Sequence, residues 1–474
     1  MRIIKSMVCV ATLMTALGHL SDVYAAEERS VANRSDAVSS AGMQKNQPSD
    51  LLKLFQEMMR DDPRIKSAQA NRDSSQGRER EALGQMLPQL SANSAYNRSL
   101  QESTSILGSD TTSFYNGKRH SLSLQQRIYE PAVWYNYRRF AALSAQQDAT
   151  TQATIESATV DLADQYFSAL AAEDELALIQ AELRATRSNL ARAKSMFERQ
   201  MAMITDVLEI SARVDALEAS EIEALNKRNT SREVLAERVG RPVTEPLKGF
   251  AEKTSFQMPS QGEQHWVNLV NNSPLLTMRQ QALEASRAAL SQAKAGHLPS
   301  VSLSLSAQRS DIGYESSQST LTDTYVASVG VQIPLYSGGS TNARVTSSYA
   351  DLMAAEQDLE ATRRQLVRET RSAFWGVDSG MKRILASQKA LASARKSRAA
   401  AEQSYEHGVL NAVDVLNRVK EEYASWRDLR KAQYDFVTNL MVLRRWTGTL
   451  AEDDIRQANE WLVAPQLTQG PGSD

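Results

Sequence analysis

Two acidic residues occupy matching places in two similar segments, and they offer the clearest chemistry in the chain. Asp206 lies in residues 197–208 (FERQMAMITDVL) and Asp414 in residues 405–416 (YEHGVLNAVDVL). Each segment lies between two long stretches with helical periodicity, so each is predicted to form the tip of a helical hairpin. A carboxylate at such a place can act as the N-cap of the returning helix, and Glu209 three residues after Asp206 fits a capping box.

Catalytic chemistry has no support in the sequence. The histidines are scattered at positions 19, 120, 265, 297 and 407, and their spacing does not match a metal site. The chain contains neither a phosphate-binding loop nor a nucleophile elbow. The formal net charge is −2, with acidic and basic residues interspersed, so the composition lacks a nucleic-acid signature. We therefore expect no enzyme activity, no cofactor, no metal and no nucleic-acid partner.

The similarity of the two tips extends into an internal repeat. The tips are offset by 208 residues, from position 197 to position 405, and the same offset relates Gly240 to Gly448. Upstream the offset is 211 residues, which relates Pro63 to Pro274 and Pro88 to Pro299. We assign residues 50–248 to repeat 1, 249–262 to a linker and 263–450 to repeat 2.

The chain ends differ from the repeats. Basic residues followed by an apolar run at residues 7–17 predict a secretory signal peptide over residues 1–25. The single cysteine, Cys9, lies within it, and we do not expect it to carry a lipid anchor. Residues 26–49 form a polar leader and residues 451–474 a C-terminal tail. We expect no transmembrane helix after the signal, so the exported chain either stays soluble or enters a membrane as β-strands.

Each repeat is predicted to begin with a broken helix, over about residues 50–86 and 263–297, interrupted before Pro63 and Pro274. At Pro88 and Pro299 the periodicity changes to two, which predicts two strands of about ten residues in each repeat. One apolar and one small polar face fit the wall of a membrane barrel. A half-buried hairpin of a soluble domain shows the same alternation.

Long helices follow Pro131 and Gly339, with about 70 residues before each tip. Apolar residues recur every seventh position, which favours left-handed supercoiling of neighbouring helices. In the first repeat the seam comprises Leu162, Ala169, Leu176, Leu183, Leu190 and Phe197. The second repeat keeps Val377, Ile384, Leu391 and Tyr405 but has Arg398 in the seam. Gly240 and Gly448 are expected to end the returning helices.

Four strands cannot close a barrel, and open sheet edges in lipid leave backbone groups without hydrogen bonds. The membrane interpretation therefore requires oligomerisation. Two copies would form eight strands with an interior filled by side chains, whereas three would form twelve and leave room for a channel.

The ordered set of features resembles the TolC-type outer-membrane efflux proteins: the signal peptide, the doubled unit, the Leu-Pro switches, Gln332 to Tyr336, and the Asp-Val-Leu tips. The resemblance covers about residues 50–450. It implies a mainly α fold with membrane β-structure, in which long α-helical hairpins form a periplasmic α-barrel. Four strands per chain would contribute to a trimeric 12-stranded outer-membrane β-barrel. The implied partners are two further copies of the chain, outer-membrane lipid, a periplasmic adaptor (membrane fusion) protein and an inner-membrane ABC or RND-type transporter.

The resemblance also implies roles for the tips. Three copies of Asp414 would form an acidic ring that favours cations, with Asn417 at the second acidic position of the ring. Tyr405 and Asp206 would belong to a latch between neighbouring hairpins.

The second tip departs from the family pattern. It reads Gly408-Val409-Leu410, so Leu410 stands where the best-studied type of the family has an arginine, and we expect a weaker latch. In the first tip, Met201 is expected to replace the glycine.

The predicted function is an outer-membrane duct that exports proteins by type I secretion, or small toxic compounds. The missing lipid-anchor cysteine favours protein-secreting ABC partners. The alternative is a periplasmic coiled-coil adaptor or structural protein without a membrane barrel, which leaves the alternating strands unexplained.

Overall fold

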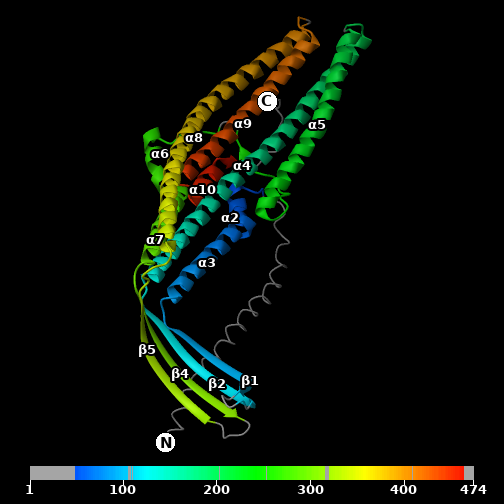
Figure 1. Cartoon of the computed structure of the whole chain (residues 1–474). Helices are drawn as coiled ribbons and strands as arrows, with labels where there is room; N and C mark the ends of the chain where they lie inside the picture. Colours follow the sequence, from blue (N-terminus) through cyan, green and yellow to red (C-terminus); the bar gives the residue numbers. More distant parts are fainter. Residues whose placement is uncertain are drawn as a thin grey trace.

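The computed structural model describes residues 48–463, except 105–107, 109, 202, 252–253, 315–319 and 408. The predicted signal peptide with Cys9, nearly all of the polar leader, Gly408 and the end of the C-terminal tail lie outside the described residues. The predicted fold class is confirmed: long helices dominate, and the four long strands form one sheet at the end of the molecule opposite to the hairpin tips (Figure 1).

The same order of elements occurs twice along the chain. The first half comprises α2 (Leu51–Asp61), α3 (Pro63–Gly84), β1 (Gln89–Thr104), β2 (Asp110–Tyr129), α4 (Pro131–Glu198) and α5 (Ile204–Val239). The second comprises α6 (Glu263–Leu269), η2 (Val270–Asn272), α7 (Pro274–Ala295), β4 (Ser300–Tyr314), β5 (Thr320–Gln332), α8 (Ser340–Glu406) and α9 (Ala412–Trp446). Three short elements complete the fold: β3 (Gly249–Phe250), α10 (Glu452–Glu460) and β6 (Leu462–Val463).

The predicted breaks in the leading helices are confirmed. Asp62 ends α2 and also caps α3, because its Oδ1 atom accepts the backbone N–H of Arg64 at 2.7 Å. Pro63 then occupies the first turn of α3, where its missing N–H has no helical partner to lose. Pro274 takes the equivalent place in α7 after Ser273.

The sheet is antiparallel, in the order β1-β2-β4-β5, so strands of both halves meet at β2 and β4. Its strands have 16, 20, 15 and 13 residues, and the predicted length of about ten is wrong. The prediction counted the apolar rows, whereas the ladder of backbone hydrogen bonds continues beyond them into polar sequence. β1 and β5 are the two edges of the sheet.

One face of the sheet is apolar near the helices. Directly paired residues lie on the same face of a sheet, so the pairing defines cross-strand rows. One row comprises Leu90, Leu124, Leu305 and Ala327, and the next comprises Ala92, Leu122, Ala307 and Tyr325. Leu90, Leu122 and Tyr325 are exposed in the isolated chain. The other face carries mainly serine, threonine, asparagine and glutamine, as expected of a wall between lipid and water.

The long helices α4 and α8 contain 68 and 67 residues, which corresponds to about 100 Å each. The predicted seam is buried at Leu162, Ala169, Leu176 and Leu183, but Phe197 is 41 % exposed and does not belong to it. In α8, Val377, Ile384 and Leu391 are buried as predicted. Within the described part of the chain, no helix has both the length and the apolar character needed to cross a membrane.

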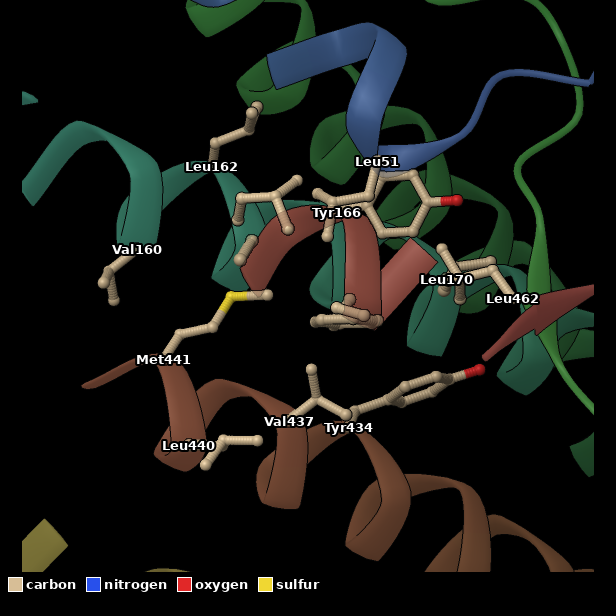
Figure 2. Close-up of a cluster of buried hydrophobic side chains, with 14 of the residues drawn as sticks. Leu51, Val160, Leu162, Tyr166, Leu170, Tyr434, Val437, Leu440, Met441 and Leu462 are labelled. Carbon is tan, nitrogen blue, oxygen red and sulfur yellow. The ribbon is translucent and has the colours of Figure 1, made fainter. Parts of the chain in front are cut away.

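The main hydrophobic core lies where α2, α4, α9 and α10 meet (Figure 2). Tyr166 is fully buried there, and its hydroxyl donates to the Lys248 carbonyl oxygen at 2.7 Å. Phe167 stacks on Tyr434 and on Phe250, with ring centroids 5.6 and 5.5 Å apart. This core joins the two halves of the chain and anchors the roots of both long hairpins.

Candidate functional site at the hairpin tips

The first tip turns through a residue in the left-handed backbone region. Gln200 has φ 61°, and the Met201 N–H donates to the Met196 carbonyl oxygen at 2.8 Å. Gln200 is the position equivalent to Gly408 at the offset of 208 residues, so the expectation that Met201 replaces the tip glycine is wrong. A non-glycine residue in this conformation carries a steric cost that a glycine avoids.

Neither tip aspartate is the N-cap of its helix, which corrects the capping prediction. Met203 is the N-cap of α5 and Asn411 that of α9, so Asp206 and Asp414 are each the third residue of the helix. There the two carboxylates lie in the first turn, close to the positive end of the helix dipole, which stabilises them. Both side chains are half-buried.

Asp414 and Asn417 are three residues apart on α9 and therefore lie on neighbouring positions of the same face. The Asn417 side chain is exposed. An acidic ring requires further copies of the chain, so these residues constitute only one protomer's share of it.

Tyr405 brings the two hairpins together near their tips. Its hydroxyl donates to Met196 Sδ on α4 at 3.6 Å, and its ring packs against the cluster of Ala193, Val207 and Ile210. Val207 directly follows Asp206, so the two predicted latch residues lie in the same region of the hairpin contact. Leu410 packs against a second apolar cluster, which includes Ala401, Val415 and Val419 and which Tyr405 also contacts.

Comparison of the chain with known protein families agrees with this architecture. The profile of the family described as "Outer membrane efflux protein" matches residues 54–241 and 267–449. The chain belongs to this family. The matched ranges cover both leading helices, all four long strands and both hairpins.

Individual members of the family align with this chain along most of their length. The chain is 25 % identical over 417 residues to Outer membrane protein TolC of Vibrio cholerae, covering 87 % of this chain and 94 % of the relative. It is 27 % identical over 432 residues to Proteases secretion protein PrtF of Dickeya chrysanthemi, covering 89 % and 93 %. The crystal structure of outer membrane protein VceC from Vibrio cholerae superposes with a TM-score of 0.72 at 18 % identity, covering 84 % of this chain and 96 % of that one.

As an outer membrane efflux protein, the chain is an export channel located in the outer membrane. The alternative of a periplasmic adaptor without membrane strands is not favoured, because the family match includes the sheet. The relatives named above are described as outer-membrane and secretion proteins.

The helix-to-strand switches have the same geometry in both halves of this family member. In each half the helix ends in a turn, and the proline is the last residue before the strand: Pro88 before β1 and Pro299 before β4. The Leu87 N–H donates to the Gly84 carbonyl oxygen at 3.1 Å, and the Leu298 N–H to that of Ala295 at 3.0 Å.

A buried charge network beneath the second tip contains Glu422, a residue that the sequence alone does not single out. Arg398, the charged residue in the α8 seam, donates to Glu422 Oε2 at 3.0 Å and to Glu402 Oε1 at 2.9 Å. Glu422 comes from α9, and its side chain is only 5 % exposed. Arg398 itself was the sequence signal for this acidic partner, because a charged residue at a heptad seam position requires an opposite charge on the facing helix.

Proposed function

We propose that three copies of this chain close one 12-stranded barrel in the outer membrane and stack their hairpins into a tunnel beneath it. The observation that carries the proposal is the open sheet: β1 and β5 end a four-stranded sheet whose outer face is apolar. Such edges are costly in lipid unless another copy pairs with them. Three copies are favoured over two because eight strands leave no lumen, and this chain lines its polar face with small side chains.

In this arrangement the two repeats, residues 50–248 and 263–450, each contribute about one sixth of a wall with approximate sixfold symmetry. Pro88 and Pro299 act as the switches that turn the tunnel helices into barrel strands. At the other end, Asp414 and Asn417 face the tunnel opening and favour cations. Tyr405, Asp206, Leu410 and Gly408 form the contacts that hold the tips together.

The tunnel docks to an inner-membrane transporter through a periplasmic adaptor protein. Protein secretion is the favoured cargo class, because two relatives of similar identity are named for protease secretion. Small-compound efflux through an RND-type pump is the second candidate, and the relatives named TolC do not specify either class.

Cross-linking between neighbouring edge strands tests the trimer. Ser91 on β1 and Val326 on β5 lie in the same cross-strand row, through Ser123 and Ser306. Because closure of a barrel staggers neighbouring edges along the strands, Ser91→Cys is combined in turn with a cysteine at each polar-face position of β5, the alternate residues 322–332. In outer membranes treated with a bismaleimide, at least one pair should form a ladder that ends at the trimer. The single native cysteine lies in the predicted signal peptide and does not interfere.

The matched control is Ser91→Cys/Ser123→Cys, whose side chains are neighbours within one chain, with Oγ atoms 2.7 Å apart. This pair should cross-link without forming a ladder. A ladder that ends at the dimer, or monomers alone in every edge-strand pair, would overturn the proposal.

A further inference from the structure

The polar face of the sheet is nearly free of charge. The described side chains on this face follow from the pairing: alternate residues of 89–99 in β1 and of 117–127 in β2, and their partners among 300–310 in β4 and 322–332 in β5. Within that set no acidic residue occurs, and the charged residues are Arg119 and Arg127. The remaining positions carry small or neutral groups, mostly serine, threonine, asparagine and glutamine.

The two arginines differ in their surroundings. Arg127 lies at the base of β2, where its Nε atom is 3.2 Å from Glu130 Oε2 and its guanidinium donates to the Gln85 carbonyl oxygen at 3.4 Å. Its charge is therefore compensated next to the helices. Arg119 is exposed and has no ion-pair partner among the residues that the structure describes.

The residues directly next to Arg119 on the polar face are small. Ala95 and Ser310 lie directly opposite on the flanking strands, and Gly117 and Ser121 are the adjacent same-face positions on β2. None of these side chains is large enough to cover a guanidinium group. Arg119 is thus a long, charged side chain among small neighbours, and it projects away from the sheet.

The opposite face shows at which level of the membrane Arg119 lies. The last wholly apolar row contains Leu122, and the next row contains Arg309 and Asp323, whose side chains form an ion pair at 2.7 Å. Beyond it, Tyr96 and Leu321 share a row with charged residues. Lys118 follows on the same face. The change from apolar to charged marks the edge of the hydrocarbon layer, at the side away from the helices.

We infer that Arg119 forms a cationic ring in the outer part of the pore, which favours anionic solutes over cations at the external mouth. The inference depends on the proposed trimer, which places three copies of Arg119 at one level of the lumen. It also gives the duct opposite charge at its two ends, with Asp414 at the tips and Arg119 near the exit.

The strength of such a ring depends on salt, because the lumen is filled with water. The Debye length is about 30 Å at about 0.01 M salt and only about 3 Å at about 1 M. The ring therefore acts across the lumen at low ionic strength and only close to the wall at high ionic strength. Solutes that carry several negative charges should respond most strongly.

Reversal potentials in planar bilayers under a KCl gradient test the inference. Arg119→Glu should shift the anion-to-cation permeability ratio toward cations by about twofold or more at low salt, and much less at about 1 M salt. The matched control is Lys118→Glu, which makes the same charge change on the adjacent residue but on the lipid-side face. It should leave the ratio close to that of the native protein.

Both variants are also measured in combination with Asp414→Asn. A dominant acidic ring at the tips then cannot mask the effect of residue 119 on the reversal potential. Equal reversal potentials for Arg119→Glu and Lys118→Glu in both backgrounds would overturn the inference while leaving the conducting trimer in place. If the native protein forms neither trimers nor channels, the proposed function and this inference both fail.

Discussion

Asn411 Oδ1 accepts the backbone N–H of Asp414 at 2.8 Å, so the cap of α9 and the acidic group of the second tip are two different residues. This separation leaves the Asp414 carboxylate free of the capping role, as the proposed acidic ring at the tunnel opening requires. It also makes the two roles separable by mutation, because either side chain can be changed while the other is kept.

Asp414→Asn should lower the cation selectivity of the channel, since it removes one negative charge per copy from the proposed acidic ring. The change should be measured as a reversal-potential shift in planar bilayers. Asn411→Ala is the control: loss of the cap should cost about 1 kcal/mol of stability while the charge is retained. Native ion selectivity in Asp414→Asn would show that Asp414 does not determine the selectivity.

Tyr405→Phe should raise the resting conductance by about twofold, because the hydroxyl contact with Met196 Sδ (3.6 Å) would contribute about 0.5 kcal/mol to the proposed latch. The ring and its packing against the apolar tip cluster are kept. Tyr423→Phe, in the neighbouring buried cluster on α9, makes the same change away from this contact. Equal resting conductance in both variants and the native channel would exclude a role of the Tyr405 hydroxyl in closure.

Much of the architecture could be predicted from sequence, because each signal was local. Proline interrupts a continuous helix, so Pro63 and Pro274 mark the breaks in the leading helices. The change from helical to twofold periodicity at Pro88 and Pro299 locates the first strand of each half. The seven-residue spacing from Leu162 to Leu183 reports a buried seam in the same direct way.

The errors concerned properties that depend on spatial neighbours. The sequence of the tips cannot distinguish Asp414 from Asn411 as the cap, since both residue types favour that position. Strand length was underestimated because backbone pairing continues beyond the regular alternation of apolar and polar residues. Glu422 went unnoticed because only the folded hairpin places it against Arg398.

Gly448→Ala should destabilise the protein much more than Gly240→Ala, although the two glycines end equivalent helices. Both have positive φ, 65° and 78°, so an alanine at either site carries a strain of about 1 kcal/mol. A Cβ atom at Gly448 would lie 2.4 Å from the Asn272 carbonyl oxygen, whereas at Gly240 the nearest atom is 3.6 Å away. Thermal unfolding of the two variants in detergent provides the comparison, and equal melting temperatures would contradict it.

Arg398→Leu should lower the free energy of unfolding by about 1–3 kcal/mol, because it leaves the buried Glu422 carboxylate with less compensation. Arg395 Nε, 3.6 Å from Glu422 Oε1, retains part of the pairing. The double variant Arg398→Leu/Glu422→Leu should recover most of the loss, since an apolar pair suits the seam. A double-mutant cycle measured by denaturant unfolding tests this, and additive losses would rule out the coupling.

The stability of the protein should fall as the pH rises from about 4.5 to about 7, because of Glu156 on α4. This side chain is 4 % exposed, and burial raises its pKa from 4.5 to about 7. A hydrogen bond from Gln152 at 3.3 Å and the positive charge of Arg445 offset only part of this effect. Between these pH values the folded chain keeps a proton that the unfolded chain releases, so deprotonation favours unfolding.

Glu156→Gln should therefore remove this pH dependence and stabilise the protein at pH 8 by about 1–3 kcal/mol, with little effect at pH 4. Melting temperatures of the purified protein across this range provide the measurement. Asp148→Asn is the control, because Asp148 is exposed on the same helix and its replacement should leave the native profile unchanged. A Glu156→Gln variant with the native pH profile would show that Glu156 is already charged in the folded state at neutral pH.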